Sequence, residues 1–408
     1  MDRKRIKILA DCPPPPTVKA LQDYKDAGLN TYVFTEDDIS YSKEPEKYIE
    51  ALHWMEDLGI DVYIRGLHGA DKNFYEKFHN IDFHDYPCIK GLYVIDEPSA
   101  NKFDDIVNNY VGWRNEKYPD LHWHINLFPS TAGKLLKAED SDGRTAYQNY
   151  LKEYEEKVLK RVSGSKDIGF DVYPFYIKEG ECALLSNWLR DAYLVSELAH
   201  KNDVDFCACV QVFSGDGWRV LDKDAYMRLQ FNTYLAFGIN MLEIFVYRSV
   251  WTAAEGTFKG MITRDGQKTD YYDFVKTALS EVKLLEEKYL QYNWKGVAVV
   301  KGDKPSDKHQ AMIDEFLPYA SKLPSYVQSI KTEQDCLVGI FEKDGKDALM
   351  IVNFNDPDCN LSTTVSISLL NKTIDCATLR GIKTNADNTT CTQQLCCGDG
   401  LFLELNDI

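Results

Sequence analysis

Two acidic residues interrupt apolar runs of this sequence in a way that indicates acid–base chemistry. The run Gly91–Ile95 is followed directly by Asp96 and Glu97, and Asp171 interrupts a second run. A carboxylate at the end of a buried strand costs free energy unless it faces solvent or a site. Pro98 is expected to hold Glu97 in extended backbone geometry, with its carboxyl at the end of the strand. The alternatives are an acid at a helix start for Glu97 and a structural anion for Asp171.

Two carboxyl groups can cleave a glycosidic bond when one is protonated and the other is ionised. Glu97 is the candidate acid, and we prefer Asp171 as second carboxylate over Glu243, whose depth in its strand the sequence does not reveal. A separation of about 5 Å predicts a covalent intermediate, and one of about 6.5–9.5 Å predicts inversion. Asp96 would raise the proton affinity of Glu97 if both faced one pocket, although adjacent strand residues normally point to opposite faces.

Amides, carboxylates and aromatic rings at the ends of other apolar runs complete a set suited to sugars. Hydroxyl groups bond to the polar side chains, and sugar rings stack on the aromatic ones. A single tryptophan of this kind is more often a packing residue. The residues predicted to contact a substrate are Asp96, Asn126, Tyr173, Gln211, Trp218, Glu243, Tyr247 and His68.

Metal-dependent chemistry has weaker support in the sequence. His122 and His124 have the spacing of a pair on one strand face, but they lie at the start of a predicted strand, where packing or capping is the expected role. There is no His-Glu-x-x-His motif, and no Gly-x-Ser-x-Gly motif of a serine hydrolase. We therefore predict no metal and no cofactor.

The elements that would position these residues alternate between short apolar runs and segments with helical periodicity, such as Pro45–Leu58 and Tyr271–Leu290. Eight strands, each followed by a helix, predict an α/β fold of the (β/α)8 TIM-barrel type. A doubly wound open sheet is disfavoured, because Pro13–Pro16 stand where its phosphate-binding glycines would be. The eight runs are Ile6–Ala10, Asn30–Thr35, Asp61–Leu67, Ile89–Ile95, Trp123–Phe128, Ile168–Tyr173, Asp205–Phe213 and Met241–Tyr247.

The pattern of apolar and polar residues changes near residue 295. Leu337–Phe341 and Ala348–Phe354 flank a strong hairpin signal at Lys343–Lys346, and further β-like runs follow. We predict a barrel over residues 1–294 and a small antiparallel β domain, a sandwich, over residues 295–408. The polar stretch Lys301–Lys308 would form an exposed joining region.

Four motifs together resemble a known family. Asp96–Ala100, Ile125–Pro129, Phe170–Pro174 and Leu229–Gly238 resemble the (β/α)8 glycoside hydrolases of the large retaining clan that includes family 42 β-galactosidases. They are closer still to uncharacterised gut-bacterial relatives with an Asp-Glu-Pro motif. The resemblance implies that Glu97 is the general acid/base.

The chain also departs from this family. The clan's nucleophile is a glutamate at the end of the seventh strand, where this sequence has Gln211, and Asp96 replaces the usual asparagine before the acid/base. The clan's double-displacement mechanism is therefore not carried over to this chain.

Composition limits the partners. The chain has 408 residues and a formal charge of −17, which disfavours nucleic acid and anionic membrane surfaces. It has no apolar run long enough to span a bilayer. Its eleven cysteines form no Cys-x-x-Cys pair, so we expect free thiols. Without a secretory signal at its start, the chain is expected to be cytoplasmic.

The leading hypothesis is therefore a glycosidase of carbohydrate metabolism that acts on an oligosaccharide, uses no cofactor, and is either a monomer or a homo-oligomer. One rival is a carbohydrate-binding protein that has lost its nucleophile, for which Gln211 is the best evidence. The other is a barrel hydrolase that removes a sugar substituent; the scarcity of histidines at the predicted rim argues against a metal-dependent version.

Overall fold

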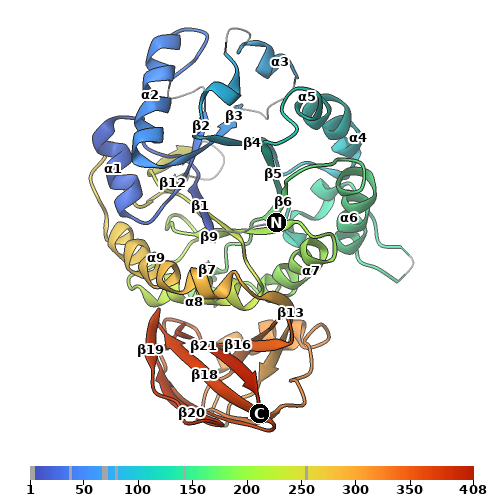
Figure 1. Cartoon of the computed structure of the whole chain (residues 1–408), viewed down its shortest axis with the longest axis vertical. Coiled ribbons are helices and arrows are strands. Elements are labelled where there is room, and N and C mark those ends of the chain that lie inside the picture. Colours follow the sequence, from blue (N-terminus) through green and yellow to red (C-terminus); the bar gives the residue numbers. More distant parts are fainter. Residues whose placement is uncertain (1–4, 36–38, 67–71, 79–80, 142, 253–255) are drawn as a thin grey trace.

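Eight parallel strands curve into a nearly closed barrel in the computed structural model, as the sequence predicts (Figure 1). The structure describes residues 5–408 except 36–38, 67–71, 79–80, 142 and 253–255. Around the barrel the order is β1-β10-β9-β6-β5-β4-β3-β2. The strands are β1 (Lys7–Ala10), β2 (Thr31–Thr35), β3 (Asp61–Arg65), β4 (Ile89–Asp96), β5 (His122–Leu127), β6 (Asp167–Phe170), β9 (Asp205–Gln211) and β10 (Met241–Phe245).

The side chain of Asn30 closes the barrel between β1 and β2. Its Oδ1 accepts a hydrogen bond from the Ile8 N–H at 2.8 Å, and its Nδ2 donates to the Ile6 carbonyl at 2.8 Å. The Asn30 N–H also donates to the Ile8 carbonyl at 3.0 Å. One side-chain amide therefore supplies hydrogen bonds that a strand ladder would otherwise provide.

Helices cover the outside of the barrel (Figure 1). The predicted helices at Pro45–Leu58 and Tyr271–Leu290 agree with α2 and α9 to within one residue, and they bury their apolar sides against the strands. Two hairpins follow β6 and β10, namely β7 (Phe175–Lys178) with β8 (Glu181–Leu184) and β11 (Val250–Thr252) with β12 (Gly256–Phe258). The helices are α1 (Val18–Asp26), α2 (Pro45–Leu58), α3 (Lys72–Glu76), α4 (Phe103–Asp105), α5 (Gly112–Lys117), α6 (Ala146–Tyr154), α7 (Trp188–Lys201), α8 (Ala225–Ala236) and α9 (Asp270–Tyr289).

The C-terminal part is a sandwich of two antiparallel sheets, as predicted. The sheets have the orders β13-β15-β16-β21-β18-β19 and β14-β17-β20, with an apolar core between them. The predicted hairpin joins β15 to β16, where Asp344 and Gly345 both have positive φ, as a tight two-residue turn requires. The elements are β13 (Asn293–Val300), α10 (Gln310–Phe316), β14 (Val327–Lys331), β15 (Cys336–Lys343), β16 (Lys346–Asn353), β17 (Thr363–Leu369), β18 (Lys372–Leu379), β19 (Ile382–Thr384), β20 (Thr390–Leu395) and β21 (Gly400–Asp407).

Buried polar contacts join the sandwich to the barrel. Arg219 makes two hydrogen bonds to the Asp356 carboxylate, at 2.8 and 2.9 Å, with both side chains buried. Gly339 of β15 lies so close to α8 that a Cβ there would be 2.5 Å from the Ala236 carbonyl oxygen. A strand carrying a side chain at this position could not pack as closely against the helix.

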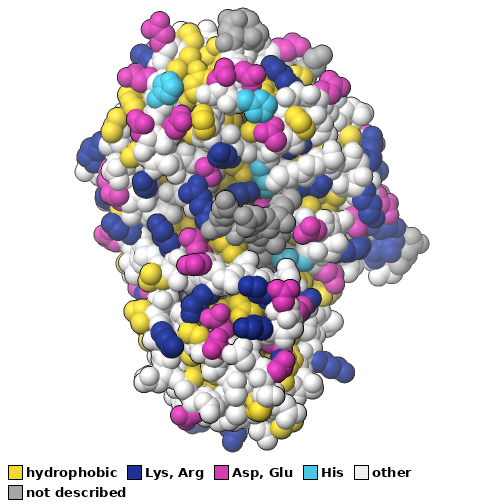
Figure 2. All heavy atoms as spheres, in the orientation of Figure 1, with side chains coloured by type: hydrophobic (Ala, Val, Ile, Leu, Met, Phe, Trp, Pro, Cys, Tyr) yellow, Lys and Arg dark blue, Asp and Glu magenta, His cyan; other side chains and the backbone are white. Residues whose placement is uncertain are grey.

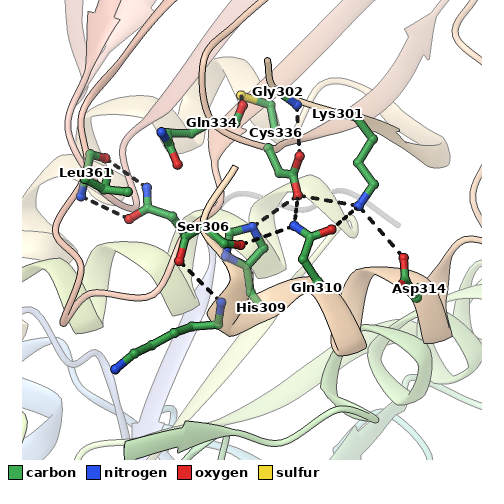
Figure 3. A network of polar contacts seen from close by, with 12 residues as sticks. Lys301, Gly302, Ser306, His309, Gln310, Asp314, Gln334, Cys336 and Leu361 are labelled. Atoms are coloured by element: carbon green, nitrogen blue, oxygen red, sulfur yellow. Dashed lines mark hydrogen bonds and ion pairs between the residues drawn. The ribbon is translucent and has the colours of Figure 1, made fainter. Parts of the chain in front are cut away.

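The segment 301–308 is largely exposed, as expected, but it is also anchored (Figure 3). The buried carboxylate of Asp335 accepts hydrogen bonds from the Gly302 N–H at 2.9 Å and from Gln310 Nε2 at 2.8 Å. His309 Nε2 lies 3.1 Å from the same carboxylate. The joining region is therefore held in place by one buried acid instead of acting as a loose linker.

The surface shows both signs of charge. On the face in Figure 2, acidic and basic side chains are intermixed and hydrophobic side chains gather only in small groups. No helix in the described part of the chain has the length and apolar character needed to cross a membrane.

The interior of the barrel holds a column of charged side chains. Lys7 Nζ lies 3.2 Å from His122 Nδ1 and 3.3 Å from Asp205 Oδ2. His122 Nε2 and His124 Nδ1 contact the two oxygens of Asp167 at 2.6 and 2.5 Å. The histidine pair thus packs inside the barrel, bonded to an acid, where such barrels normally hold branched apolar side chains.

We predict that Asp167→Asn lowers the free energy of unfolding by about 3–5 kcal/mol, because it removes one partner of a buried ion pair. His124→Gln should cost a similar amount, and the double variant should lose much less than the sum of the two losses. Urea unfolding of the four proteins would measure this coupling.

The exposed contact between His84 and Asp120, at 2.9 Å, is the matched control. The same substitutions there should cost less than about 1 kcal/mol. Additive losses at Asp167 and His124 would show that the two side chains are not coupled.

Candidate active site

Arg65, which the sequence analysis did not identify, is a cation at the barrel mouth. Its guanidinium lies 4.0 Å from the centroid of the Tyr93 ring. One of its nitrogens bonds to Asp11, and another lies 3.2 Å from Asp96. Burial raises the pKa of Asp11 to about 7, because Arg65 offsets only part of that effect and the charges of Glu243 and Asp96 add to it.

Asp96 faces the mouth because β4 contains a bulge. The pairing of β4 with β5 shifts between Tyr93 and Ile95, so Asp96 comes to lie opposite Asn126. The Asn126 Nδ2 donates to Asp96 at 3.0 Å, while the buried Asn126 Oδ1 has no hydrogen-bond partner in the described part of the chain. Asn126 therefore keeps a buried acceptor without a partner next to Asp96.

Glu97 adopts a left-handed backbone conformation with φ of 45°, so the predicted extended geometry is wrong. Its N–H donates to the Asn126 carbonyl at 2.9 Å, which fixes the turn against β5. This conformation is uncommon and costs free energy for a residue with a Cβ, and such residues cluster at functional sites. The bulge and this turn together let Asp96 and Glu97 face the same mouth, although they are neighbours in the sequence.

The carboxyl groups of Glu97 and Asp171 share a hydrogen bond. Such a bond requires that one of the two carries a proton. Burial raises the pKa of Asp171 well above its ordinary value, and the charge of Glu97 raises it further. The second oxygen of Asp171, Oδ1, is buried without a hydrogen-bond partner among the described residues. The two acids singled out from the sequence thus meet in one place.

An aromatic group borders Asp171. The Tyr173 ring stacks on Phe245 with centroids 5.4 Å apart, and Trp218 meets Tyr173 edge-on at 5.9 Å. All three rings are partly exposed, and buried Phe213 and Phe258 support them from behind. Tyr173 and Trp218 were predicted to contact a sugar; Tyr173 lies near enough for the charge of Asp171 to raise its pKa, and Trp218 contacts Tyr173.

Glu243 lies below the mouth, buried and 3.3 Å from His124 Nε2. Burial disfavours the charged form of His124, but the carboxylates of Asp167 and Glu243 outweigh it and raise its pKa to about 10. His124 therefore carries a positive charge at neutral pH. Glu243 is placed to act on the mouth through its charge.

A metal is a poor fit for the same atoms. His124, Asp167 and Cys207 each place a ligand atom within 4.8 Å of the others. Both ring nitrogens of His124 already face carboxylates, however, and burial raises the pKa of the Cys207 thiol, which disfavours the thiolate that binds metals. The ion pair accounts for this cluster.

Gln211 fits a sugar-contacting role least well. It is fully buried, and its side-chain amide exchanges two hydrogen bonds with the backbone of Phe175, at 2.8 and 2.9 Å. Gln230 of α8 in turn bonds to the Gln211 backbone at 2.8 and 3.0 Å. Gln211 therefore holds the chain after β6 in place, and its amide oxygen is not available to a ligand.

Another predicted contact, Tyr247, packs against a helix instead of the acids. Tyr247 is buried, and its ring packs 5.1 Å from Tyr24 of α1, outside the mouth. Its backbone N–H donates to the Asp11 carbonyl at 3.1 Å. His68 lies outside the described residues.

We predict that Asp171→Asn stabilises the chain at pH 8 and has no effect near pH 4. The pKa of Asp171 in the folded chain is raised above its unfolded value, so this group stabilises the fold below about pH 4 and loses that contribution as the pH rises. Asparagine carries no charge, so the substitution removes this destabilisation. We expect the free energy of unfolding to rise by at least about 1 kcal/mol at pH 8.

Thermal unfolding between pH 4 and pH 8 would measure the difference, with Asp57→Asn on the exposed side of α2 as control. A melting temperature that Asp171→Asn lowers at pH 8, or shifts equally at both pH values, would contradict the assignment.

No protein-family model matches the chain, and no curated protein is similar to it in sequence. Solved structures with a related fold are glycoside hydrolases. A β-galactosidase from Bacillus circulans sp. alkalophilus aligns at 10% identity over 98% of this chain and 99% of its own, with a TM-score of 0.49. A putative α-L-fucosidase from Bacteroides thetaiotaomicron aligns at 13% identity over 60% of this chain and 88% of its own, with a TM-score of 0.41.

A β-galactosidase from the psychrophilic Marinomonas ef1 aligns at 12% identity over 69% of this chain, with a TM-score of 0.40. This chain spans 60% of the length of that enzyme. At such identities the likeness concerns the fold alone.

Proposed function

We propose that this protein is a glycoside hydrolase that cleaves an oligosaccharide, with Glu97 as the general acid and Asp171 as the second carboxylate. The observation that supports this most directly is the closeness of the two carboxyl groups, directly after β4 and β6, since the charge of Glu97 and a hydrogen bond with it both raise the pKa of Asp171. Active sites of (β/α)8 barrels form at this end of the strands. Two carboxyl groups that hold one proton between them are the machinery that glycosidic cleavage needs.

The surroundings would keep a proton on the pair. Arg65 pairs with Asp11 and Asp96, whereas Asp171 has a carboxyl neighbour instead of a cation. The raised pKa of Asp171 places this proton on Asp171 in the resting pair. Glu97 would act as the general acid after taking the proton from Asp171, which is then left ionised. The remaining ionised carboxyl can then stabilise positive charge on the sugar ring or attack it.

The partly exposed rings of Tyr173 and Trp218 would stack on a sugar ring beside the acids. Asn126 Oδ1, which has no partner within the described chain, would accept a hydrogen bond from a sugar hydroxyl. Asp96 is 44% exposed and could accept another. This combination of apolar faces and acceptors favours a carbohydrate over a purely apolar or an anionic small molecule at the pair itself.

The contact between the carboxyl groups has a mechanistic consequence. Glycosidases hold their two carboxyl groups about 5–5.5 Å apart for retention and about 6.5–9.5 Å apart for inversion. A bond to be cleaved therefore has to enter between Glu97 and Asp171 and replace their hydrogen bond. Substrate binding would open the pair and place the shared proton on the glycosidic oxygen.

The closed pair also favours a second candidate function, a carbohydrate-binding protein without catalytic activity. In that case the carboxyl pair would stay closed, and the sugar would bind only to the aromatic rings and acceptors around it. The engaged amide of Gln211, where the resembling family has its nucleophile, is consistent with this alternative.

Assays of Glu97→Gln and Asp171→Asn on a panel of aryl glycosides and oligosaccharides test the hydrolase directly. We expect each substitution to lower kcat by about 10²–10⁴-fold, since each removes one acid–base partner. Glu50→Gln, on the exposed side of α2, should leave turnover unchanged.

Unchanged turnover in either variant would exclude that residue from the mechanism. Binding of a glycan that persists in Glu97→Gln, together with no hydrolysis by the wild type, would establish the binding protein instead.

A further inference from the structure

A groove with a volume of about 800 Å³ lies beside the barrel mouth. Its walls are Pro14–Pro15 after β1, the first turn of α1, Tyr247–Arg248 after β10, and the segment Ile262–Lys268. The groove is tied to the site, because the Tyr247 N–H donates to the Asp11 carbonyl and the Arg248 N–H to the Cys12 carbonyl, both at 3.1 Å. Pro14 is three residues beyond Asp11, so the two are at most about 10 Å apart along the chain.

The charge of this groove is opposite to that of the whole chain. Among the described residues, the groove is lined by the cations Lys19, Arg248, Arg264 and Lys268 and by two acids, Asp23 and Asp265, whereas the chain as a whole carries −17. Asp23 binds both lysines, at 2.5 and 2.7 Å, and these contacts lower its pKa. Asp265 accepts a hydrogen bond from Thr263. The four cations outnumber these two acids, and the first turn of α1 adds a partial positive charge.

Hydrogen bonds and a cation–π contact hold the segment Ile262–Lys268, which carries Arg264, in place. The Thr263 N–H donates to the Gln267 carbonyl at 2.8 Å, and the turn closes at Gly266, whose φ of 86° suits a glycine. The Ile262 N–H donates to the Tyr247 carbonyl at 2.8 Å. Lys268 lies 4.1 Å above the Tyr272 ring. These contacts hold the cations on fixed backbone, so binding an anion requires little ordering of the groove.

We propose that this groove binds the anionic group of an acidic oligosaccharide, a carboxylate or a sulfate, while a neighbouring sugar unit reaches Glu97. Arginine side chains bind such planar or multi-oxygen anions through paired N–H groups. The part of this inference that concerns Glu97 depends on the proposed function. The groove itself is a separate binding site outside the ring of barrel strands.

The test uses the full chain with Glu97→Gln, which suppresses turnover, on an array of oligosaccharides. Uronic acid oligomers are paired with their methyl esters, and sulfated oligomers with their desulfated forms, so that the two kinds of anion are distinguished. We expect binding to the acidic forms, weakening with added salt. Adding Arg264→Glu should weaken this binding about tenfold, since it replaces an attraction with a repulsion at this exposed position.

Lys283→Glu, on the exposed side of α9, changes the net charge equally and should leave binding unchanged. The proposal would be overturned by equal binding of acidic and neutral forms or by binding to no member of the array. It would also be overturned if Arg264→Glu had an effect no larger than that of Lys283→Glu. Wild-type turnover separates the two hypotheses. Acidic glycans that bind but are not cleaved would support the anion-binding groove and contradict the hydrolase proposal. Cleavage without preference for acidic forms would support the hydrolase and contradict the anion-binding groove.

Discussion

An ionised carboxylate inside a protein barrel is stable only when other groups supply the charge and hydrogen bonds that water would otherwise provide. Asp167 obtains both from His122 and His124, each at hydrogen-bond distance from a different oxygen. The two histidines divide the roles. Burial and the charge of Lys7 lower the pKa of His122, which therefore stays neutral and acts as a hydrogen-bond partner, while His124 carries the compensating charge.

This arrangement sets the electrostatics of the mouth. His124 neutralises Asp167 from one ring nitrogen and faces Glu243 with the other, so its single charge is shared by two acids. The column therefore leaves negative charge beneath the mouth, where Asp11 and Asp96 contact Arg65 and where Glu97 and Asp171 contact each other. The last two of these acids share a proton. Arg65 offsets only part of the effect of burial on Asp11, whose pKa is still raised to about 7, and Asp171 has no such cation among the causes of its raised pKa.

The architecture could be predicted because it depends on patterns that repeat along the sequence. Eight apolar runs separated by amphipathic segments define a barrel even when individual ends are misplaced; the sixth run was predicted to reach Tyr173, but β6 ends at Phe170. The prediction that Glu97 and Asp171 meet rested on the same rule, since the ends of parallel strands share one edge.

The direction in which individual side chains point could not be predicted from the sequence, because it depends on local backbone geometry. One bulge in β4 and one left-handed residue bring Asp96 and Glu97 to the same side. Gln211 was assigned to the sugar although its partner, the backbone of Phe175, has no sequence signature. Arg65 and Asp11 were missed even though each is a charged residue at the end of an apolar run, which is the same signal that identified Asp171.

The closed carboxyl pair places an energetic condition on the proposed reaction. Opening it exchanges a charge-assisted hydrogen bond, worth about 1.5–3 kcal/mol, for contacts with the substrate. A sugar face that covers about 100 Å² of the Tyr173 and Trp218 rings would contribute about 2.5 kcal/mol, a comparable amount. If the proposed reaction holds, a single sugar unit would therefore stack beside the pair without opening it. A longer glycan, with further contacts along the rim, has the binding free energy to separate the two carboxyl groups, so chain length would govern turnover more strongly than it governs binding.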